Sequence, residues 1–351
     1  MSVSYIMLNK SELENAVQKG VVSEESRERI LKYVARLREN NVPVIFNLRH
    51  LRKICGISKR EQNKYFGINR GQLYRQFNIP KRSGGIRTIE APEDKLKTIQ
   101  RWIKDDILDS FSTSEYATGF KKGMSIVDNA RPHVGKELVI NIDLKDFFPT
   151  IHYTDVIRVF SYMGYRTDVA HLLTRLCTNG NNVLPQGSPA SPALSNLVSL
   201  RLDKRLGQLA LKLNCTYSRY ADDITFSGDK GIRAALPLIR DIIVDEGFEV
   251  NEDKVRLQYS HQRQEVTGLV VNERLSVSPR IKNEIKSAIH YCKKYGVADH
   301  MRYIGCDKFF YKEHLYGLAY FIHMVDVELG QKYLRELDEI QWDWSGKLLE
   351  E

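Results

Sequence analysis

Two adjacent acidic residues, Asp222 and Asp223, are the strongest candidates in this sequence for residues that take part in chemistry. They lie between two short runs of alternating residues, 215–220 and 224–228, which predict a hairpin with the acids at its tip. Two carboxylates held side by side repel each other unless cations neutralise them. Mg²⁺ prefers oxygen ligands and often binds substrate phosphates as well, so the pair suggests a metal site. A solvated surface turn is the alternative explanation of the pair alone.

A third carboxylate, Asp143, ends the most apolar run of the chain, residues 138–142. Asp143 alone could be a turn residue, but with Asp222 and Asp223 it completes a set of three. Two metal ions held about 3.5–4 Å apart by such a set can activate a hydroxyl group and stabilise a leaving pyrophosphate. We therefore predict phosphoryl transfer with two Mg²⁺ ions, or Mn²⁺ as an alternative, held by these three aspartates.

The elements that position these acids are predicted to be a mixture of helices and strands. Residues 77–89 read as a hairpin with a Ser-Gly-Gly turn and cations on both arms, and residues 266–271 as a short strand. The apolar spacing and composition predict helices at 11–40, 48–65, 96–111, 193–213, 232–246 and beyond 279.

The composition is that of a folded globular protein, with 42% hydrophobic and 28% charged residues among 351. Lys and Arg outnumber Asp and Glu by 53 to 44, and the net charge of +9 favours a polyanionic partner such as nucleic acid. The five scattered cysteines form no CxxC or Cys/His pattern, so neither a disulfide framework nor a zinc site is predicted. The sequence carries no recognisable leader or membrane span, and we expect a soluble cytoplasmic protein without a membrane partner.

The residues around the acids resemble three consecutive motifs of reverse transcriptases, in the expected order. These motifs are Asn-Ile-Asp-Leu-Lys-Asp-Phe-Phe-Pro at 141–149, Leu-Pro-Gln-Gly-Ser-Pro at 184–189 and Tyr-Ala-Asp-Asp at 220–223. The resemblance covers about residues 77–325, whereas the first 60 or so residues carry no motif that we can match.

Three further stretches resemble the retron branch of that family. Asn-Ala-Arg-Pro-His at 129–133 is similar to its NAxxH element, Val-Thr-Gly at 266–268 to its VTG element, and residues 313–321 to its thumb segment. The resemblance implies an α+β right-hand polymerase fold with fingers, palm and helical thumb and no RNase H domain. The implied divisions are an N-terminal helical extension and start of the fingers at 1–76, fingers at 77–137, a palm at 138–270 with finger segments inserted around 150–185, and a thumb with C-terminal tail at 271–351.

The resemblance also implies roles for residues near the incoming nucleotide. Phe148 matches an aromatic gate that excludes a ribose 2′-hydroxyl by clash, although it could be a core residue. Gln186 and Gly187 belong to a loop whose glycine lets the backbone approach nucleotide and template closely. Lys254 could donate a proton to pyrophosphate or simply lie near it, and Asp146 could be a local cap or form a salt bridge.

Other residues are predicted to bind phosphates or RNA. Arg87, together with either Lys81 or Arg82, would hold the triphosphate, unless the hairpin is merely exposed. Asn129 and His133 could contact RNA or tie parts of the fold together. Residues 271–314 hold nine Lys/Arg against five Asp/Glu, a net charge of +4, so this block could lie against RNA or be a solvated face. Its candidate RNA-binding residues are Lys282, Lys286, Lys293 and Lys294.

Membership of the retron family would imply an RNA-directed DNA polymerase that uses dNTPs. Its template would be a cognate structured non-coding RNA of the msr-msd type, copied into a branched RNA–DNA product (msDNA). Such products commonly act with an effector protein encoded nearby in anti-phage defence. The alternatives are a group II intron-type reverse transcriptase, or a non-catalytic RNA-binding or antitoxin scaffold with a polymerase fold.

Overall fold

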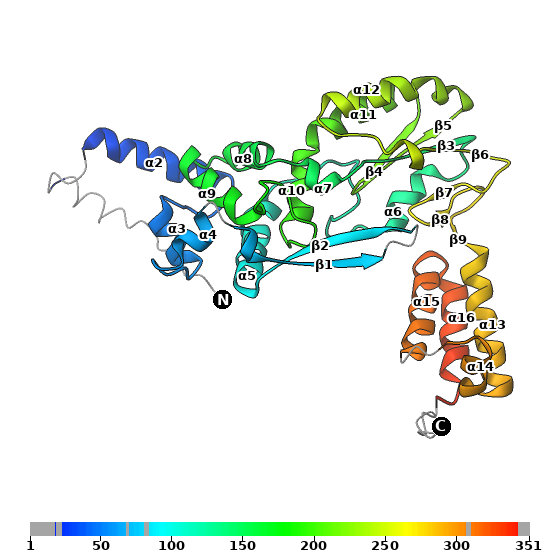
Figure 1. The fold of residues 1–351 in the computed structure, drawn as a ribbon. Coiled ribbons are helices and arrows are strands. Elements are labelled where there is room, and N and C mark those ends of the chain that lie inside the picture. Colours follow the sequence, from blue (N-terminus) through cyan, green and yellow to red (C-terminus); the bar gives the residue numbers. More distant parts are fainter. Residues whose placement is uncertain (1–17, 19–22, 68–69, 81–83, 307–309, 343–351) are drawn as a thin grey trace. The chain divides into compact units, whose positions relative to one another are not determined.

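A computed structural model describes residues 18, 23–67, 70–80, 84–306 and 310–342 of the chain. The helices and strands that these residues form are labelled in Figure 1. By their contacts the residues belong to two compact units. Unit 1 combines Met1–Lys122, Asp143–Gln208 and Pro237–Asn251, and unit 2 combines Gly123–Ile142, Leu209–Leu236 and Glu252–Glu351. Both units contain helices and strands, so the predicted α+β class is confirmed.

The described residues of unit 1 form helices and one hairpin. Its helices are α2 (Glu24–Glu39), α3 (Leu48–Ile54), α4 (Gln62–Phe66), α5 (Asp94–Asp106), α7 (Phe147–Thr150), α8 (Tyr153–Tyr162), α9 (Thr167–Cys177), α10 (Ser191–Val198), most of α11 (Leu200–Lys212) and most of α12 (Leu236–Asp245). The single helices predicted at 48–65 and 193–213 are wrong, because each is interrupted. Gly56, at a φ of 64°, separates α3 from α4, and the buried Ser199 separates α10 from α11.

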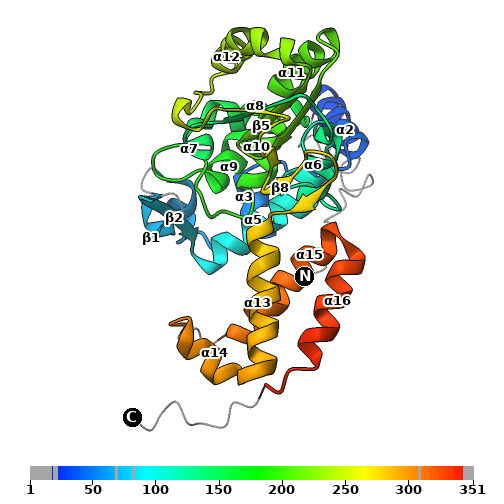
Figure 2. The same cartoon turned by 90° about the vertical axis from the view of Figure 1, so that its right-hand side faces the viewer.

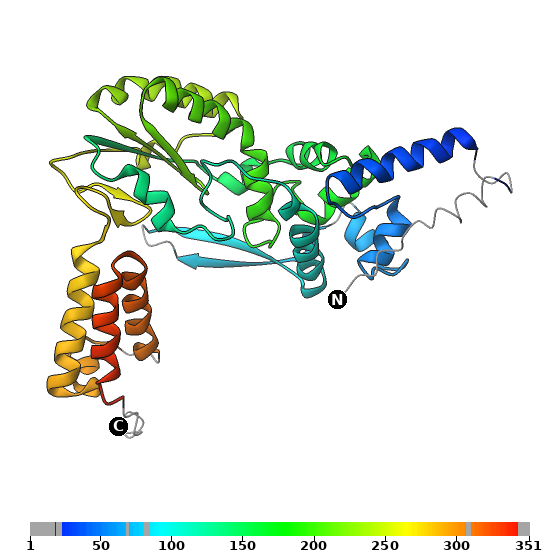
Figure 3. The same cartoon turned by 180° about the vertical axis from the view of Figure 1, so that it is seen from behind.

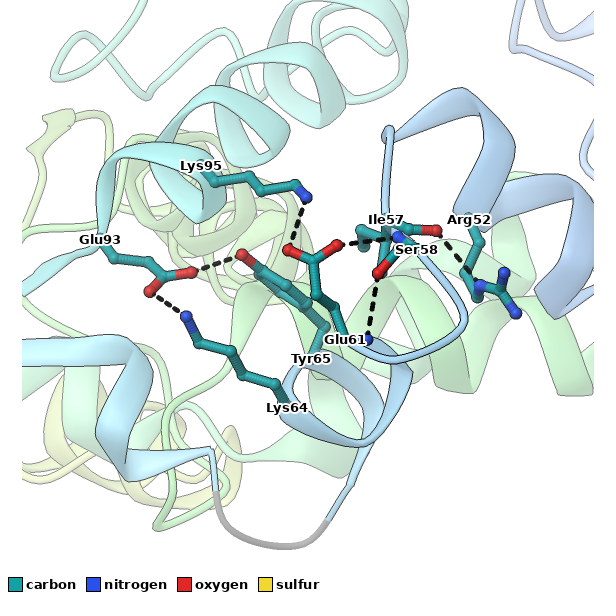
Figure 4. Close-up of polar contacts among 8 residues, drawn as sticks. All are labelled: Arg52, Ile57, Ser58, Glu61, Lys64, Tyr65, Glu93 and Lys95. Atoms are coloured by element: carbon teal, nitrogen blue, oxygen red, sulfur yellow. Dashed lines mark hydrogen bonds and ion pairs between the residues drawn. The ribbon is translucent and has the colours of Figure 1, made fainter.

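A polar network joins α4 to the start of α5 (Figure 4). The Nζ atom of Lys95 lies 2.8 Å from a carboxylate oxygen of Glu61, while Lys64 and the Tyr65 hydroxyl both donate to Glu93. Partly exposed ion pairs of this kind contribute only about 0.2–1 kcal/mol each. Their combined effect is to fix α4 against α5, next to the strand that precedes α5.

The hairpin of unit 1 is longer than predicted. β1 (Tyr74–Pro80) and β2 (Ile86–Pro92) pair antiparallel over their whole length, from Tyr74 opposite Pro92 to Pro80 opposite Ile86. The residues at 81–83, which include the predicted Lys81 and Arg82, lie outside the described residues.

Unit 2 contains the sheet that carries the acidic hairpin. Its strands are β3 (Leu138–Asp143), β4 (Thr216–Tyr220), β5 (Asp223–Gly228) and β6 (Arg256–Tyr259), in the order β4-β5-β3-β6. A three-stranded sheet follows, with β7 (Glu265–Val266), β8 (Leu269–Val270) and β9 (Ser276–Val277). The single strand predicted at 266–271 is therefore wrong, because Thr267 and Gly268 turn the chain at φ values of 47° and 81°.

The remaining helices of unit 2 are α6 (Ile126–Ala130), α13 (Pro279–Tyr295), α14 (Val297–Tyr303), α15 (Tyr311–Val325) and α16 (Val327–Asp338). α13, α15 and α16 lie side by side (Figures 2 and 3) around a core that includes Ile285, Leu315 and Leu337. No helix within the described residues has both the length and the apolar character needed to cross a lipid bilayer.

Candidate active site

Asp222 and Asp223 lie on the turn between β4 and β5, as the alternating pattern predicts. Tyr220 pairs with Asp223, so Ala221 and Asp222 form a two-residue loop. Ala221 has a φ of 58°, a left-handed conformation that glycine usually supplies at the first position of such a loop. For a residue with a side chain this conformation costs about 1–3 kcal/mol. The turn therefore holds the two acids in a backbone geometry that the rest of the hairpin must stabilise.

A buried arginine supports this turn from within unit 2. Arg219 is 0% exposed, and its Nη1 atom donates a hydrogen bond of 3.0 Å to the carbonyl oxygen of Ala221. Its positive charge lies next to the acidic turn and opposes the repulsion between the two carboxylates. Sequence reasoning did not single out Arg219, because an arginine in an alternating strand reads as an exposed residue.

His133 joins the two strands of the acidic hairpin. Its Nδ1 atom lies 2.6 Å from the Ser227 hydroxyl on β5, and its Nε2 atom lies 2.8 Å from the Ser218 hydroxyl on β4. A neutral imidazole has one donor and one acceptor nitrogen, so it accepts from one serine and donates to the other. Burial lowers the pKa of His133 to about 3, with the nearby charge of Lys136 as a smaller cause. The imidazole is therefore neutral at physiological pH.

Direct contact with RNA, one of the two roles predicted for Asn129 and His133, stays a prediction. Both side chains are 0% exposed, on α6 and on the 3₁₀ turn that follows it. The same hydrogen-bonding groups that suit RNA also suit a polar pair of serines inside a protein. The alternative role, tying parts of the fold together, agrees with the contacts of His133.

The third predicted acid, Asp143, is the last residue of β3. Within unit 1, the side-chain amide of Asn251 donates to a carboxylate oxygen of Asp143 over 3.1 Å, and its backbone N–H donates to the Asp143 carbonyl over 2.8 Å. This double contact restrains the orientation of the carboxylate. Sequence reasoning missed Asn251, since a lone asparagine about a hundred residues away carries no signal of its own.

The donor set agrees with the chemistry of Mg²⁺. β3 is the neighbour of β5 in the sheet, so Asp143 ends the strand next to the one that Asp223 begins. Asp223 is exposed and Asp222 partly exposed, so both carboxylates can reach an ion. Among the described residues, no group of three or more His, Cys, Asp or Glu side chains is arranged to hold a metal ion, so the structure does not bring Asp143, Asp222 and Asp223 together as a formed ion site. Mg²⁺ typically takes one or two carboxylates and completes its octahedron with water and substrate phosphates, which an open set of acids permits.

The loop of Gln186 and Gly187 lies against strand β2. The backbone N–H of Glu90 donates to the carbonyl oxygen of Gln186 over 2.9 Å. Gly187 has a φ of 138°, and a Cβ atom there would lie 2.8 Å from the Glu90 carbonyl oxygen. Glycine is therefore needed because the loop touches β2. The structure thus brings this loop to the strand that carries Arg87, whose side chain is exposed.

Phe148 lies on the short helix α7, where its ring is partly exposed. Its centroid is 5.5 Å from that of Phe147 and 6.0 Å from that of Phe120. Phe147 is the buried member of the pair, so the two neighbours have different surroundings. Asp146 precedes α7 at a φ of 45° and makes no capping hydrogen bond through its side chain, so the predicted cap is not formed.

The remaining predicted cations differ in their surroundings. Lys254 ends an exposed 3₁₀ turn (Glu252–Lys254) of unit 2. Four lysines of α13 were predicted to bind RNA, namely Lys282, Lys286, Lys293 and Lys294. Lys293 is paired with Glu339 at 2.7 Å, and Lys282 donates to a serine hydroxyl. Lys286 is exposed, and Lys294 lies over a tyrosine ring.

Comparison with known proteins finds relatives of this chain by sequence. Residues 79–306 match the family model described as reverse transcriptase (RNA-dependent DNA polymerase). The chain is 33% identical over 345 residues to the retron Mx162 reverse transcriptase of Myxococcus xanthus, covering 87% of this chain and 69% of that one. It is 33% identical over 311 residues to the retron Ec86 reverse transcriptase of Escherichia coli, covering 87% and 93%. Among solved structures, a telomerase from Candida albicans aligns with a TM-score of 0.46 and 13% identity, over 75% of this chain and 54% of that chain.

Replacing His133 by alanine should destabilise unit 2. The substitution leaves two buried serine hydroxyls without their shared partner and creates a cavity, and we expect the free energy of unfolding to fall by about 2–4 kcal/mol. Chemical denaturation of the purified protein measures this change. The exposed His290→Ala variant on α13 is the control and should change little. An unchanged stability of the His133 variant would contradict the role that we assign to this histidine.

The buried neutral state of His133 also predicts a pH dependence. Its pKa is lowered from 6.5 to about 3, so between these values the unfolded chain binds a proton that the folded chain does not. Stability contributed by the neutral imidazole is therefore complete above pH 6.5 and declines as the pH falls. Between pH 7 and pH 5 the parent protein should lose about 2 kcal/mol more than His133→Gln does. Parallel unfolding curves at both pH values test this, and equal losses would show that His133 is not the group responsible.

Proposed function

The chain belongs to the retron reverse transcriptases and is an RNA-directed DNA polymerase, and from that premise we propose that it copies a structured non-coding RNA into a branched RNA–DNA product. The paired carboxylates of the β4–β5 turn, supported by Arg219, carry the catalytic part of this proposal. The excess of basic residues, 53 against 44, favours an RNA partner. The retron relatives favour this reading over that of a group II intron enzyme.

We assign the two Mg²⁺ ions to Asp143, Asp222 and Asp223. When bound, the ions supply the charge that activates the attacking hydroxyl and neutralises the leaving pyrophosphate. The protein's own part is to hold the three carboxylates where they can share that charge. Asn251 restrains Asp143, while Arg219 and His133 hold the hairpin of Asp222 and Asp223. Positioning of this kind is most of what phosphoryl transfer requires of a protein.

The nucleotide would be bound by residues of unit 1. Arg87 is exposed on β2 and suits the triphosphate, because a guanidinium group can donate two parallel hydrogen bonds to phosphate oxygens. The loop of Gln186 and Gly187, fixed on the same strand, would present its backbone to the nucleotide. Phe148 would limit access to the 2′ position of the sugar. Lys254 stays a candidate proton donor to the pyrophosphate.

The partners of this polymerase follow from the same proposal. The template would be a cognate RNA of the msr-msd type, the substrates dNTPs, and the cDNA would remain joined to the RNA through a 2′-hydroxyl. An effector protein restrained by the enzyme and its product would connect this activity to anti-phage defence. Lys286 and Lys294 on α13 are the exposed lysines best suited to contact the RNA backbone.

Replacing Asp222 by asparagine should abolish DNA synthesis. The change removes one negative charge from the proposed ion site, and the loss of several kcal/mol of transition-state stabilisation corresponds to a rate lower by at least about 10³-fold. Extension of a primed RNA template measures the rate in vitro. In cells, the RNA-linked DNA should disappear while the RNA still co-purifies with the protein.

The exposed Asp229→Asn, at the other end of β5, is the matched control and should polymerise normally. Residual synthesis by Asp222→Asn close to that of the control would refute the assignment of the metal site. Normal synthesis in vitro without any RNA-linked DNA in cells would instead leave the polymerase intact and refute the branched product.

Replacing Phe148 by alanine should weaken discrimination against ribonucleotides. Removal of the ring frees the space in which a 2′-hydroxyl would clash, and the ratio of kcat/KM for dNTP over rNTP should fall at least about tenfold. Single-nucleotide incorporation assays measure both values. Phe147→Leu is the control, since Phe147 is buried and should affect stability rather than sugar choice. Equal discrimination in the parent and Phe148→Ala proteins would indicate that Phe148 is only a packing residue.

A further inference from the structure

Unit 1 contains a cavity of about 370 Å³ that is lined by hydrogen-bond donors. Its lining includes the side chains of Arg70, Tyr153, His171, Arg175 and Asn182, and no Asp or Glu of the described residues. Two arginines beside one cavity form a positive environment. Neither the catalytic acids nor the residues proposed for the nucleotide line it.

Arg70 is the buried arginine of this cavity, with 4% of its surface exposed. Its guanidinium donates to the carbonyl oxygens of Arg175 and Asn179, the hydroxyl of Thr178 and the Oδ1 atom of Asn182, over 2.6–3.3 Å. None of these acceptors is a carboxylate, and the Nε atom has no acceptor. The charge is thus held by neutral groups at the end of α9, which favour a cation but do not neutralise it.

Arg175 adds a second positive charge beside the first. It donates to the backbone carbonyl of Phe66, and within the described residues neither Arg175 nor Arg70 forms an ion pair with an acid. The pKa of Arg70 is lowered by burial and, to a smaller extent, by the charge of Arg175. Two neighbouring arginines without an anion are unfavourable, because their charges repel each other and the buried Arg70 is poorly solvated.

His171 and Tyr153 extend the donor set. His171 lies one helical turn before Arg175 on α9, so both side chains are on the same face of the helix. The Tyr153 hydroxyl is 2.8 Å from the Nδ1 atom of His171, and the two rings are stacked with centroids 5.7 Å apart. One nitrogen of the imidazole is thereby engaged, which leaves Nε2 for another partner.

We propose that this cavity binds a phosphate group. Guanidinium groups donate to phosphate oxygens in a bidentate manner, and a dianion or a phosphodiester would provide the charge that both arginines lack. The residues bonded to Arg70 at 178–182 lead directly into the loop of Gln186 and Gly187. A phosphodiester of a single-stranded RNA is therefore the preferred occupant, and a free phosphate or pyrophosphate ion is the other source of the same chemistry. Only the choice of RNA rests on the proposed function.

The test measures binding of a single-stranded RNA oligonucleotide without dNTPs or metal ions, so that it does not depend on catalysis. Arg175→Gln should weaken binding about tenfold, the effect of one lost charged hydrogen-bonding group. The slope of log Kd against log salt should fall by about 0.7, as for one phosphate contact with a single strand. His171→Gln serves as a second variant in case Arg175→Gln does not fold. Arg158→Gln on α8 is the matched control, because Arg158 is 78% exposed and already paired with Asp155.

Calorimetry with inorganic phosphate and with pyrophosphate distinguishes the sources. Weaker RNA binding by Arg175→Gln or His171→Gln supports a phosphodiester site. Normal RNA binding with loss of phosphate or pyrophosphate binding supports a site for the free ion. Folded variants that bind RNA, phosphate and pyrophosphate as the control does would overturn the proposal. None of these outcomes bears on polymerisation, which the Asp222→Asn variant tests separately.

Discussion

The repulsion between two adjacent carboxylates is the constraint on which the rest of this structure depends. Asp222 and Asp223 sit on a two-residue turn whose first residue, Ala221, has a left-handed backbone. Such a turn is unfavourable both electrostatically and sterically, so it persists only where its surroundings determine it. Here the surroundings are the buried charge of Arg219 and the two hydrogen bonds of His133, which stabilise the turn from inside the hairpin. Polar groups in the core of unit 2 therefore hold the acidic turn in place.

The sequence predicts the positions of the acids better than it predicts the buried residues that hold them. An acidic pair between alternating runs predicts a hairpin tip, and an apolar run ending in Asp143 predicts a strand, because both patterns depend on residues near in sequence. The contacts of His133 with Ser218 and Ser227 join residues 85 and 94 positions apart, and no local pattern encodes them. The same groups also suit RNA, which is why the motif alone left two roles open. The side chains of Asn129 and His133 are both buried, and the contacts of His133 agree with the structural role.

Breaks within elements illustrate a second limit. The helical periodicity across 193–213 continues through Ser199, yet the chain ends one helix there and begins another. Thr267 and Gly268 likewise turn the chain inside a run of apolar residues that reads as one strand. Gly187 is the opposite case, since its neighbourhood in sequence shows only a loop, while the close approach of the Glu90 carbonyl explains why it is glycine. Each of these features depends on what packs nearby, which periodicity does not contain.

The two sites that we propose both gather charges of one sign. In unit 2 the acids of the hairpin need cations, and in unit 1 Arg70 and Arg175 need an anion. A protein that only had to be stable would offset a buried charge such as that of Arg70 with an acid or replace it by an apolar residue, because a buried charge without a counter-charge is destabilising. A polymerase meets both needs from its substrates, since metal ions arrive with the nucleotide and phosphates with the nucleic acid. In the complexes that we propose, metal ions and phosphates would offset these charges, so that binding rather than folding would favour their positions.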